Sequence, residues 1–145
     1  MSQLNASGQS KSDYVAVYDP GNSTISRLDV AGYNSNRGLS LHGLDVVPSS
    51  SNLDDLFLYL VNHRAPTNGK DAREAGADSS IEIFKTSVGS PKMVYRSTVE
   101  DPLIITPNDI VGSPDGKSFY FTNDHGSKTG GVSSAPCTLK SYSHH

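Results

Sequence analysis

The residues best suited to chemistry are histidine, asparagine and aspartate side chains at the ends of short apolar runs. His42 opens one such run, and His63 follows the end of the next. Asn108-Asp109 opens a later run, and residues 123–125, Asn-Asp-His, close the one after it. Amide and carboxylate oxygens suit a hard cation such as Ca²⁺, which takes about six to eight oxygen ligands. Imidazole titrates near neutral pH and can therefore give or take a proton there.

Each of these residues also has a purely structural explanation. Asn-Asp pairs at strand ends commonly form turns by bonding to their own backbone. A single histidine beside a glycine, as at His42, is more often structural than catalytic. Their joint placement at strand ends is what favours a site. The oxygen donors are too few for a full calcium shell, so a calcium site here would be partial.

Residues 107–125 contain a hairpin that would bring several of these side chains together. The apolar residues 110–111 and the aromatic residues 119–121 flank the sequence Ser-Pro-Asp-Gly. Proline presets φ and glycine accepts positive φ, so this sequence predicts a tight turn. The two ends of an antiparallel pair lie at one edge of the sheet. Asn108-Asp109 and residues 123–125 should therefore share a rim.

Other apolar runs of strand length recur along the chain, bounded by Gly, Pro, Asn or Ser. They are residues 14–18, 24–30, 41–47, 56–62, 81–84 and 92–99, with a weaker run at 138–142. The polar, glycine-rich composition of residues 63–79 predicts a long surface loop with a helical turn at 71–75. Since no convincing amphipathic helix appears, the fold class is predicted to be all-β.

An internal repeat relates these strands. The matching segments are 14–18 with 80–84 and 42–48 with 108–114, both shifted by 66 residues, and 58–63 with 119–125, which pairs His63 with His125 through one extra residue. A four-stranded unit that recurs at a fixed period is typical of a β-propeller blade. Residues His42 and Asn108 would then occupy equivalent positions on the innermost strands, facing the central channel.

The strand count predicts a partial β-propeller with about two blades' worth of strands. It comprises the last two strands of one blade, a whole blade at about 41–99, and the first two strands of a third. Propellers close with about four to eight blades, so this chain cannot close a ring alone. We expect residues 1–12 to be disordered, 13–129 to form the partial propeller and 130–145 to be a divergent, weakly ordered tail. Open strand edges predict self-association, which sedimentation would test.

Composition restricts the partners. The chain has 145 residues, with 12 basic and 15 acidic side chains and a net charge of −3, which does not favour nucleic acid or an anionic membrane. No apolar run approaches the length of a transmembrane helix. The N-terminal sequence lacks the apolar region of a signal peptide. The single Cys137 and the sequons at Asn5 and Asn22 leave the compartment open.

Three segments in order carry a family resemblance: LSLHGLDVVPSSSNLDDLFLYLVNHR, SSIEIF and PNDIVGSPDGKSFYFTNDHG. Together they resemble the serum paraoxonase/arylesterase family, in a form typical of fungal members, over residues 13–129. The ordered set HG, VNH, NDI and TNDH is more specific than any one piece. The resemblance implies a six-bladed parent propeller, often secretory, with two Ca²⁺ ions in its central channel. It also implies hydrolysis of small-molecule aryl esters or lactones.

The resemblance assigns roles to the polar residues. His42 and His63 match the family's histidine dyad, a proposed general base and its support. Asp124 and His125 match further active-site residues. In the implied chemistry, Ca²⁺ polarises the ester carbonyl and the histidine pair assists the attack of water.

The implied metal ligands are Asn108 for the catalytic Ca²⁺, and Asp109 with the backbone carbonyl of Leu44 for the structural Ca²⁺. The family's Glu-Asp ligand pair has no equivalent before Tyr14, and its later ligands have none after Thr129. We therefore expect a truncated chain that neither binds Ca²⁺ tightly nor hydrolyses esters alone. Two alternatives stay open: a non-catalytic module that acts only through binding, and a gluconolactonase-like hydrolase, which the paired HG and VNH histidines disfavour.

Overall fold

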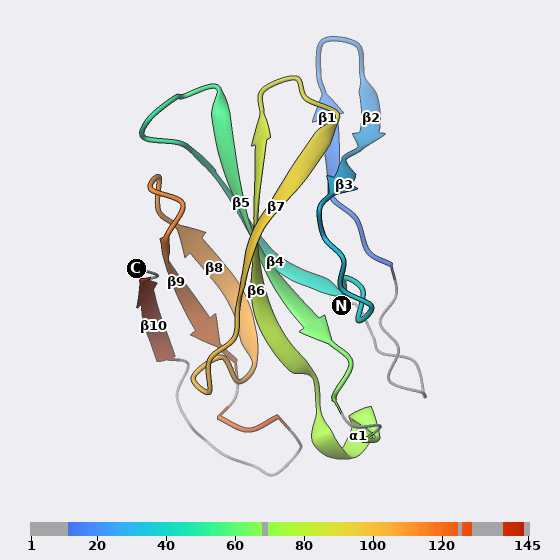
Figure 1. Cartoon of the computed structure of the whole chain (residues 1–145), viewed down its shortest axis with the longest axis vertical. Coiled ribbons are helices and arrows are strands. Elements are labelled where there is room, and N and C mark those ends of the chain that lie inside the picture. The colour runs from blue at the N-terminus through green and yellow to red at the C-terminus, as the bar shows by residue number, and fades with distance from the viewer. Residues whose placement is uncertain (1–11, 68–69, 125, 129–137, 144–145) are drawn as a thin grey trace.

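The strands of the chain form three sheets (Figure 1). The computed structural model describes residues 12–67, 70–124, 126–128 and 138–143. Within these residues the only helix is the single turn α1, Ala72–Ala75, which confirms the predicted helical turn. The predicted all-β class is confirmed, and the arrangement of open sheets is that of a partial propeller.

The central sheet contains one complete blade. Its antiparallel strands follow the chain order, which confirms the whole blade predicted at about residues 41–99. They are β4 (Leu41–Pro48), β5 (Asp55–Arg64), β6 (Asp78–Ser87) and β7 (Lys92–Val99). The nearly unbroken apolar run in β5 is explained by its place inside the sheet, because a central strand with both faces covered is apolar on both sides.

The strand predicted at residues 24–30 is divided in two. The chain breaks at Leu28, whose side chain is buried, into β2 (Thr24–Arg27) and β3 (Asp29–Ala31). Strand β2 pairs with β1 (Ala16–Asp19), whereas β3 pairs in parallel with β7. The free edge of β7 explains the difference, since unpaired backbone groups at a sheet edge accept an added strand.

The loop predicted at residues 63–79 is shorter than expected. Strand β5 continues to Arg64 and β6 begins at Asp78, and these two residues face each other in the register. The Arg64 guanidinium donates from Nε to the Asp78 carbonyl oxygen at 3.2 Å. The paired strands therefore extend through a polar stretch that hydrophobic periodicity assigned to a loop.

The third sheet contains the hairpin predicted within residues 107–125. Strands β8 (Pro107–Gly112) and β9 (Ser118–Asn123) pair antiparallel around a turn in which Gly116 has a φ of 73°. Strand β10 (Thr138–Ser143) pairs with the outer edge of β9, so the third blade has three strands rather than the two predicted. The weak strand predicted at residues 138–142 is thus confirmed.

A register shift recurs at the same place in the two innermost strands. The pairing of β4 with β5 shifts between Leu41 and Leu44, and that of β8 with β9 shifts between Pro107 and Ile110. These positions lie 66 residues apart, so the repeat includes its irregularity. A bulge of this kind turns the strand and re-aims its side chains.

The register corrects one detail of the repeat. Leu41 faces Asn62, and the equivalent Pro107 faces Asn123. The residue equivalent to His63 is therefore Asp124, and the pairing of His63 with His125 through an extra residue is wrong. Hydrophobic similarity alone could not place the register, because the ends of the two segments are polar.

Apolar clusters cover both faces of the central sheet. The cluster toward the third sheet is formed by Tyr59, Val61, Ile81, Ile83, Val99, Ile104, Ile110, Phe119 and Phe121. The cluster on the opposite face is formed by Val15, Leu28, Leu58, Leu60, Phe84 and Met93. At the inner strand β4 this opposite face is only partly covered, since Leu44 is 48% and Val46 44% exposed.

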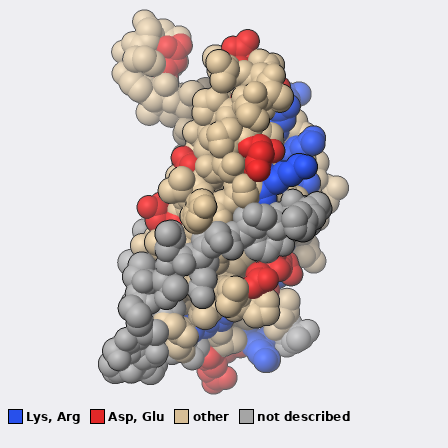
Figure 2. Space-filling view, turned by 90° about the vertical axis from the view of Figure 1, so that its left-hand side faces the viewer, with Lys and Arg blue, Asp and Glu red and all other residues tan. Residues whose placement is uncertain are grey.

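Charged side chains of both signs are visible on the face that Figure 2 shows. Acidic groups are spread along its whole length, and the basic groups in view lie mainly along one edge.

Within the described residues, no helix has the length and apolarity needed to cross a membrane.

Candidate functional site

The inner strands β4 and β8 bring His42 and Asn108 into contact, as their equivalent positions in the repeat predict. The imidazole Nε2 of His42 forms a short hydrogen bond with Asn108 Oδ1. The close approach depends on Gly43, because a Cβ atom there would lie 2.3 Å from the carbonyl oxygen of Asn108. The glycine of the HG motif therefore serves the contact between two blades.

The two predicted histidines lie side by side. The rings of His42 and His63 meet edge to face, with centroids 5.5 Å apart and an interplanar angle of 67°. His63 stands near the end of β5, and its Nδ1 lies 3.0 Å from Ser79 Oγ on β6. Asn108 thus bonds to His42, the two histidine rings contact each other, and His63 bonds to Ser79.

The environment of His63 favours its neutral form. Burial of the ring lowers the pKa of His63 below its usual value, and the neighbouring His42 lowers it further. The carboxylate of Asp124 acts in the opposite direction, which also places this charge near the histidine pair. An imidazole kept neutral at physiological pH can accept a proton.

Asp124 therefore joins the two histidines and Asn108 at one rim. It follows β9 directly, is exposed, and its backbone N–H donates to the carbonyl oxygen of Thr106 at 3.0 Å. His125, the fourth residue predicted to be catalytic, lies outside the described residues.

The other two predicted metal ligands lie next to the point where β4 and β8 meet. The Cα of Asp109 is 3.1 Å from the position of a Cβ on Gly43, the residue that precedes Leu44. The Asp109 side chain is exposed, and its Oδ1 accepts the backbone N–H of Ile110 at 2.9 Å. Asp109 and Leu44 therefore lie beside the histidine pair along the inner strands.

The donors fit calcium in kind and not in number. Asn108, Asp109 and the backbone of Leu44 offer hard oxygen atoms, but Ca²⁺ takes about six to eight. In the part of the chain that the structure describes, no group of three or more His, Cys, Asp or Glu residues is arranged to hold a metal ion. Three ligands alone would therefore leave a calcium shell incomplete.

Two buried asparagines organise the rim. The sequence prediction gave Asn62 no role and placed Asn123 only within the polar group 123–125. In the central blade, Asn62 Oδ1 accepts the backbone N–H of Ser40 at 2.8 Å, and the backbone N–H of His63 donates to the Ser40 carbonyl oxygen at 2.8 Å. The end of β5 is thereby tied to the residues that precede β4. This tie sets His63 beside His42.

The third blade contains the same arrangement. Asn123 Oδ1 accepts the backbone N–H of Thr106 at 3.0 Å, and the backbone N–H of Asp124 donates to the Thr106 carbonyl oxygen at 3.0 Å. Ser40 and Thr106 are related by the 66-residue repeat. In each blade, the asparagine side chain and the backbone N–H after it thus hold one residue before the inner strand, an arrangement that we call the clamp. The Asn in both VNH and TND was the sequence signal that could have revealed it.

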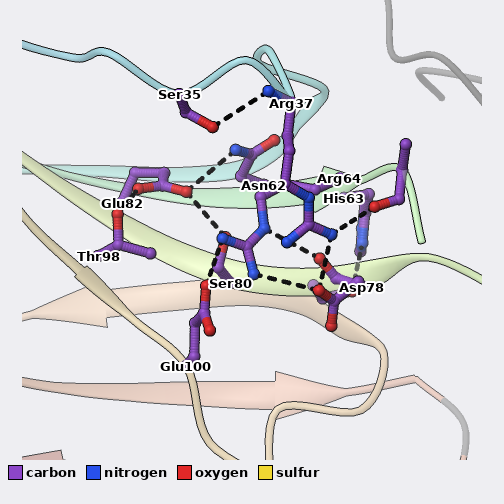
Figure 3. Close-up of polar contacts among 12 residues, drawn as sticks. Ser35, Arg37, Asn62, His63, Arg64, Asp78, Ser80, Glu82, Thr98 and Glu100 are labelled. Atoms are coloured by element: carbon purple, nitrogen blue, oxygen red, sulfur yellow. Dashed lines mark hydrogen bonds and ion pairs between the residues drawn. The ribbon is translucent and has the colours of Figure 1, made fainter. Parts of the chain in front are cut away.

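Asn62 is itself held by a buried carboxylate (Figure 3). Its Nδ2 donates to Glu82 Oε1 at 3.1 Å, and Ser80 Oγ donates to the same oxygen at 2.8 Å. Thr98 Oγ1 donates to Glu82 Oε2 in a short hydrogen bond, and Tyr33 OH lies 3.3 Å from Oε1. Glu82 is fully buried. A single acid inside the apolar run of β6 was the visible sign of this network.

We expect the free energy of unfolding to fall as the pH drops below about 6.5 because of His63. Its pKa is lower in the folded chain than the ordinary value of 6.5, so the unfolded chain binds a proton more readily. Stability from this group is present above about pH 6.5 and is lost as the pH falls toward the folded pKa. Urea unfolding at about pH 7.5 and about pH 5.5 measures the loss, and His63→Gln should remove that part of it. An equal loss in this variant would assign the dependence to other groups.

Comparison with known proteins shows the family of the chain. The family model for arylesterases matches residues 14–130, which include the complete blade and the hairpin of the third. The chain therefore belongs to the arylesterase family.

Two curated relatives carry family names that agree. Mouse serum paraoxonase/lactonase 3 is 29% identical over 99 residues, which cover 68% of this chain and 24% of the relative. Chicken serum paraoxonase/arylesterase 2 is 31% identical over 103 residues, which cover 70% of this chain and 23% of the relative. The chain thus matches about a quarter of the length of each.

Proposed function

We propose that this chain is a portion of a calcium-dependent arylesterase/lactonase, which hydrolyses small-molecule carboxylic esters or lactones. The observation that carries the proposal is the cluster of His42, His63, Asn108 and Asp124 at the rim where β4 and β8 meet. Membership of the arylesterase family supports the reaction class. The names of the two relatives supply the substrate classes.

In this proposal the histidine pair handles the proton of the attacking water. Burial keeps His63 neutral, so it can receive a proton, and its contact with His42 gives a route between the two rings. The hydrogen bond to Asn108 fixes the orientation of His42. Asp124 would offset the positive charge that develops on the pair.

The metal requires donors beyond those described. Asn108, Asp109 and the Leu44 carbonyl would supply part of a calcium shell, and other residues would have to complete it. We therefore propose that the isolated chain has little or no hydrolytic activity. A role in binding alone is the second candidate, because the three named donors fall short of the number that Ca²⁺ takes, about six to eight.

The purified chain should not hydrolyse phenyl acetate or a lactone in a calcium-dependent way, and it should bind Ca²⁺ with a dissociation constant of about 10⁻³ M or weaker. Isothermal titration calorimetry and a chromogenic ester assay measure the two properties. Calcium-dependent turnover by the isolated chain would contradict the proposed inactivity.

A chimera provides the matching positive arm. The 99 residues of this chain that align with mouse serum paraoxonase/lactonase 3 would replace the corresponding segment of that protein. We expect calcium-dependent lactone hydrolysis that His63→Gln reduces by about 100-fold or more. A folded chimera with calcium bound and no turnover would favour the binding role instead.

A further inference from the structure

We propose that Ser79 is a positioning residue, which holds His63 in the tautomer protonated on Nδ1 and leaves Nε2 as the proton acceptor. The inference rests on the proposed function, in which His63 belongs to the histidine pair. It adds a residue and a protonation state that neither the sequence motifs nor the family match assign.

The backbone presents Ser79 directly to His63. The two residues face each other in the register of β5 with β6, and Ser79 Oγ lies 3.0 Å from His63 Nδ1. Ser79 is 5% exposed, so bulk water competes poorly for this contact. In the part of the chain described, this is the only side-chain hydrogen bond of the His63 ring.

The neighbouring pairs of the same ladder fix the geometry on both sides (Figure 3). On one side, Arg64 bonds to the Asp78 carbonyl oxygen and forms an ion pair with Glu100 at 2.5 Å. On the other side, Asn62 and Ser80 both donate to the buried Glu82. Ser79 and His63 therefore have little freedom to separate, so the hydrogen bond sets the orientation of the ring.

The Ser79 hydroxyl can accept a hydrogen bond from Nδ1–H or donate one to an unprotonated Nδ1, and the proton-accepting role of His63 in the proposed function selects the first arrangement. A neutral imidazole carries one N–H and one lone pair, and its partner at the first nitrogen decides which nitrogen keeps the lone pair. If Nδ1–H donates to Ser79 Oγ, the lone pair remains on Nε2. This nitrogen can then receive a proton from water or from the neighbouring His42.

A cavity makes the assignment testable by a conservative substitution. Ser79 lines a cavity of about 270 Å³ together with Pro102 and Ile104. We expect the additional methyl group of threonine to enter this space while the hydroxyl keeps its contact with His63. Ser79→Thr should therefore preserve the hydrogen bond that Ser79→Ala removes.

The experiment is long-range ¹H–¹⁵N correlation NMR of the imidazole rings in the full 145-residue chain, above the pH at which His63 binds a proton. The wild-type chain should show a protonated Nδ1 and an unprotonated Nε2 for His63. In Ser79→Ala the two ¹⁵N shifts should move toward the Nε2-protonated form. Ser79→Thr should keep the wild-type pattern.

Ser87→Ala is the matched control, because Ser87 lies on the same strand and its Oγ donates to Asp55 instead of a histidine. This variant should leave the His63 shifts unchanged. A wild-type His63 protonated on Nε2 would overturn the proposal even if Ser79→Ala failed to fold. Unchanged shifts in a folded Ser79→Ala would overturn it as well.

Failure of this proposal is distinguishable from failure of the proposed function, because the tautomer is measured without metal or ester. The Nδ1-protonated form in the wild-type chain together with an inactive, calcium-loaded chimera would retain the role of Ser79 and reject the hydrolase. An active chimera with His63 protonated on Nε2 would do the reverse.

Discussion

Replacing Asn62 by leucine should lower the free energy of unfolding by about 4 kcal/mol, because one buried amide serves two strands and a buried acid. The substitution removes the acceptor of the Ser40 N–H and a donor to Glu82. The buried Ser40 N–H is left without its acceptor, which costs about 1–3 kcal/mol. Glu82 keeps its bond from Ser80 but loses one hydrogen bond to its carboxylate, and such bonds contribute about 1.5–3 kcal/mol. Urea unfolding followed by far-ultraviolet circular dichroism measures the change.

Two variants separate the clamp from the side chain's size and polarity. Asn34→Leu places the same substitution at an exposed residue and should change stability by about 0.5 kcal/mol or less. Asn62→Asp keeps the acceptor for Ser40 but sets a second carboxylate beside Glu82. It should therefore also destabilise the chain. If Asn62→Leu lowered the free energy of unfolding no more than Asn34→Leu does, the clamp would not stabilise the fold.

Replacing Gly43 by alanine should lower the free energy of unfolding by about 3 kcal/mol and separate His42 from Asn108. The added Cβ would lie 2.3 Å from the Asn108 carbonyl oxygen and 3.1 Å from the Asp109 Cα. Both obstacles are backbone atoms, so the clash is relieved only if β4 and β8 move apart. Unfolding measures the loss, and the imidazole shifts of His42 report the broken contact.

Gly89→Ala is the control for the loss of glycine itself. Gly89 has a φ of 78°, and a Cβ added there would have no atom within 4 Å, so the cost of this substitution is conformational, about 1 kcal/mol. We expect this variant to leave the His42 shifts unaltered. If Gly43→Ala were as mild as Gly89→Ala, the close approach of the two blades would not need glycine.

The parts of the fold that follow short-range patterns could be predicted from the sequence. The Pro-Asp-Gly turn at residues 114–116 and the alternation around it specify the β8–β9 hairpin locally. The 66-residue repeat then placed His42 and Asn108 on equivalent strands, and the structure joins them directly. The repeat carried long-range information that no single motif contains.

The remainder depends on partners that are distant in sequence. The pairing of β3 with β7 follows from a free sheet edge, and the equivalence of His63 with Asp124 follows from backbone register. Glu82 is acceptable in an apolar strand only because Asn62 and Ser80 reach it. Such compensation is invisible until the strands are paired, because local propensity does not report it.

The recurrence of the bulge in β4 and β8 separates the scaffold of the rim from its chemistry. Both innermost strands change register at the same repeat position, so the backbone of each blade holds the residue there in an equivalent position. In β4 this position holds the imidazole of His42, and in β8 it holds the amide of Asn108. Repeated blades of this design can therefore differ in chemistry through single side chains while the backbone stays the same.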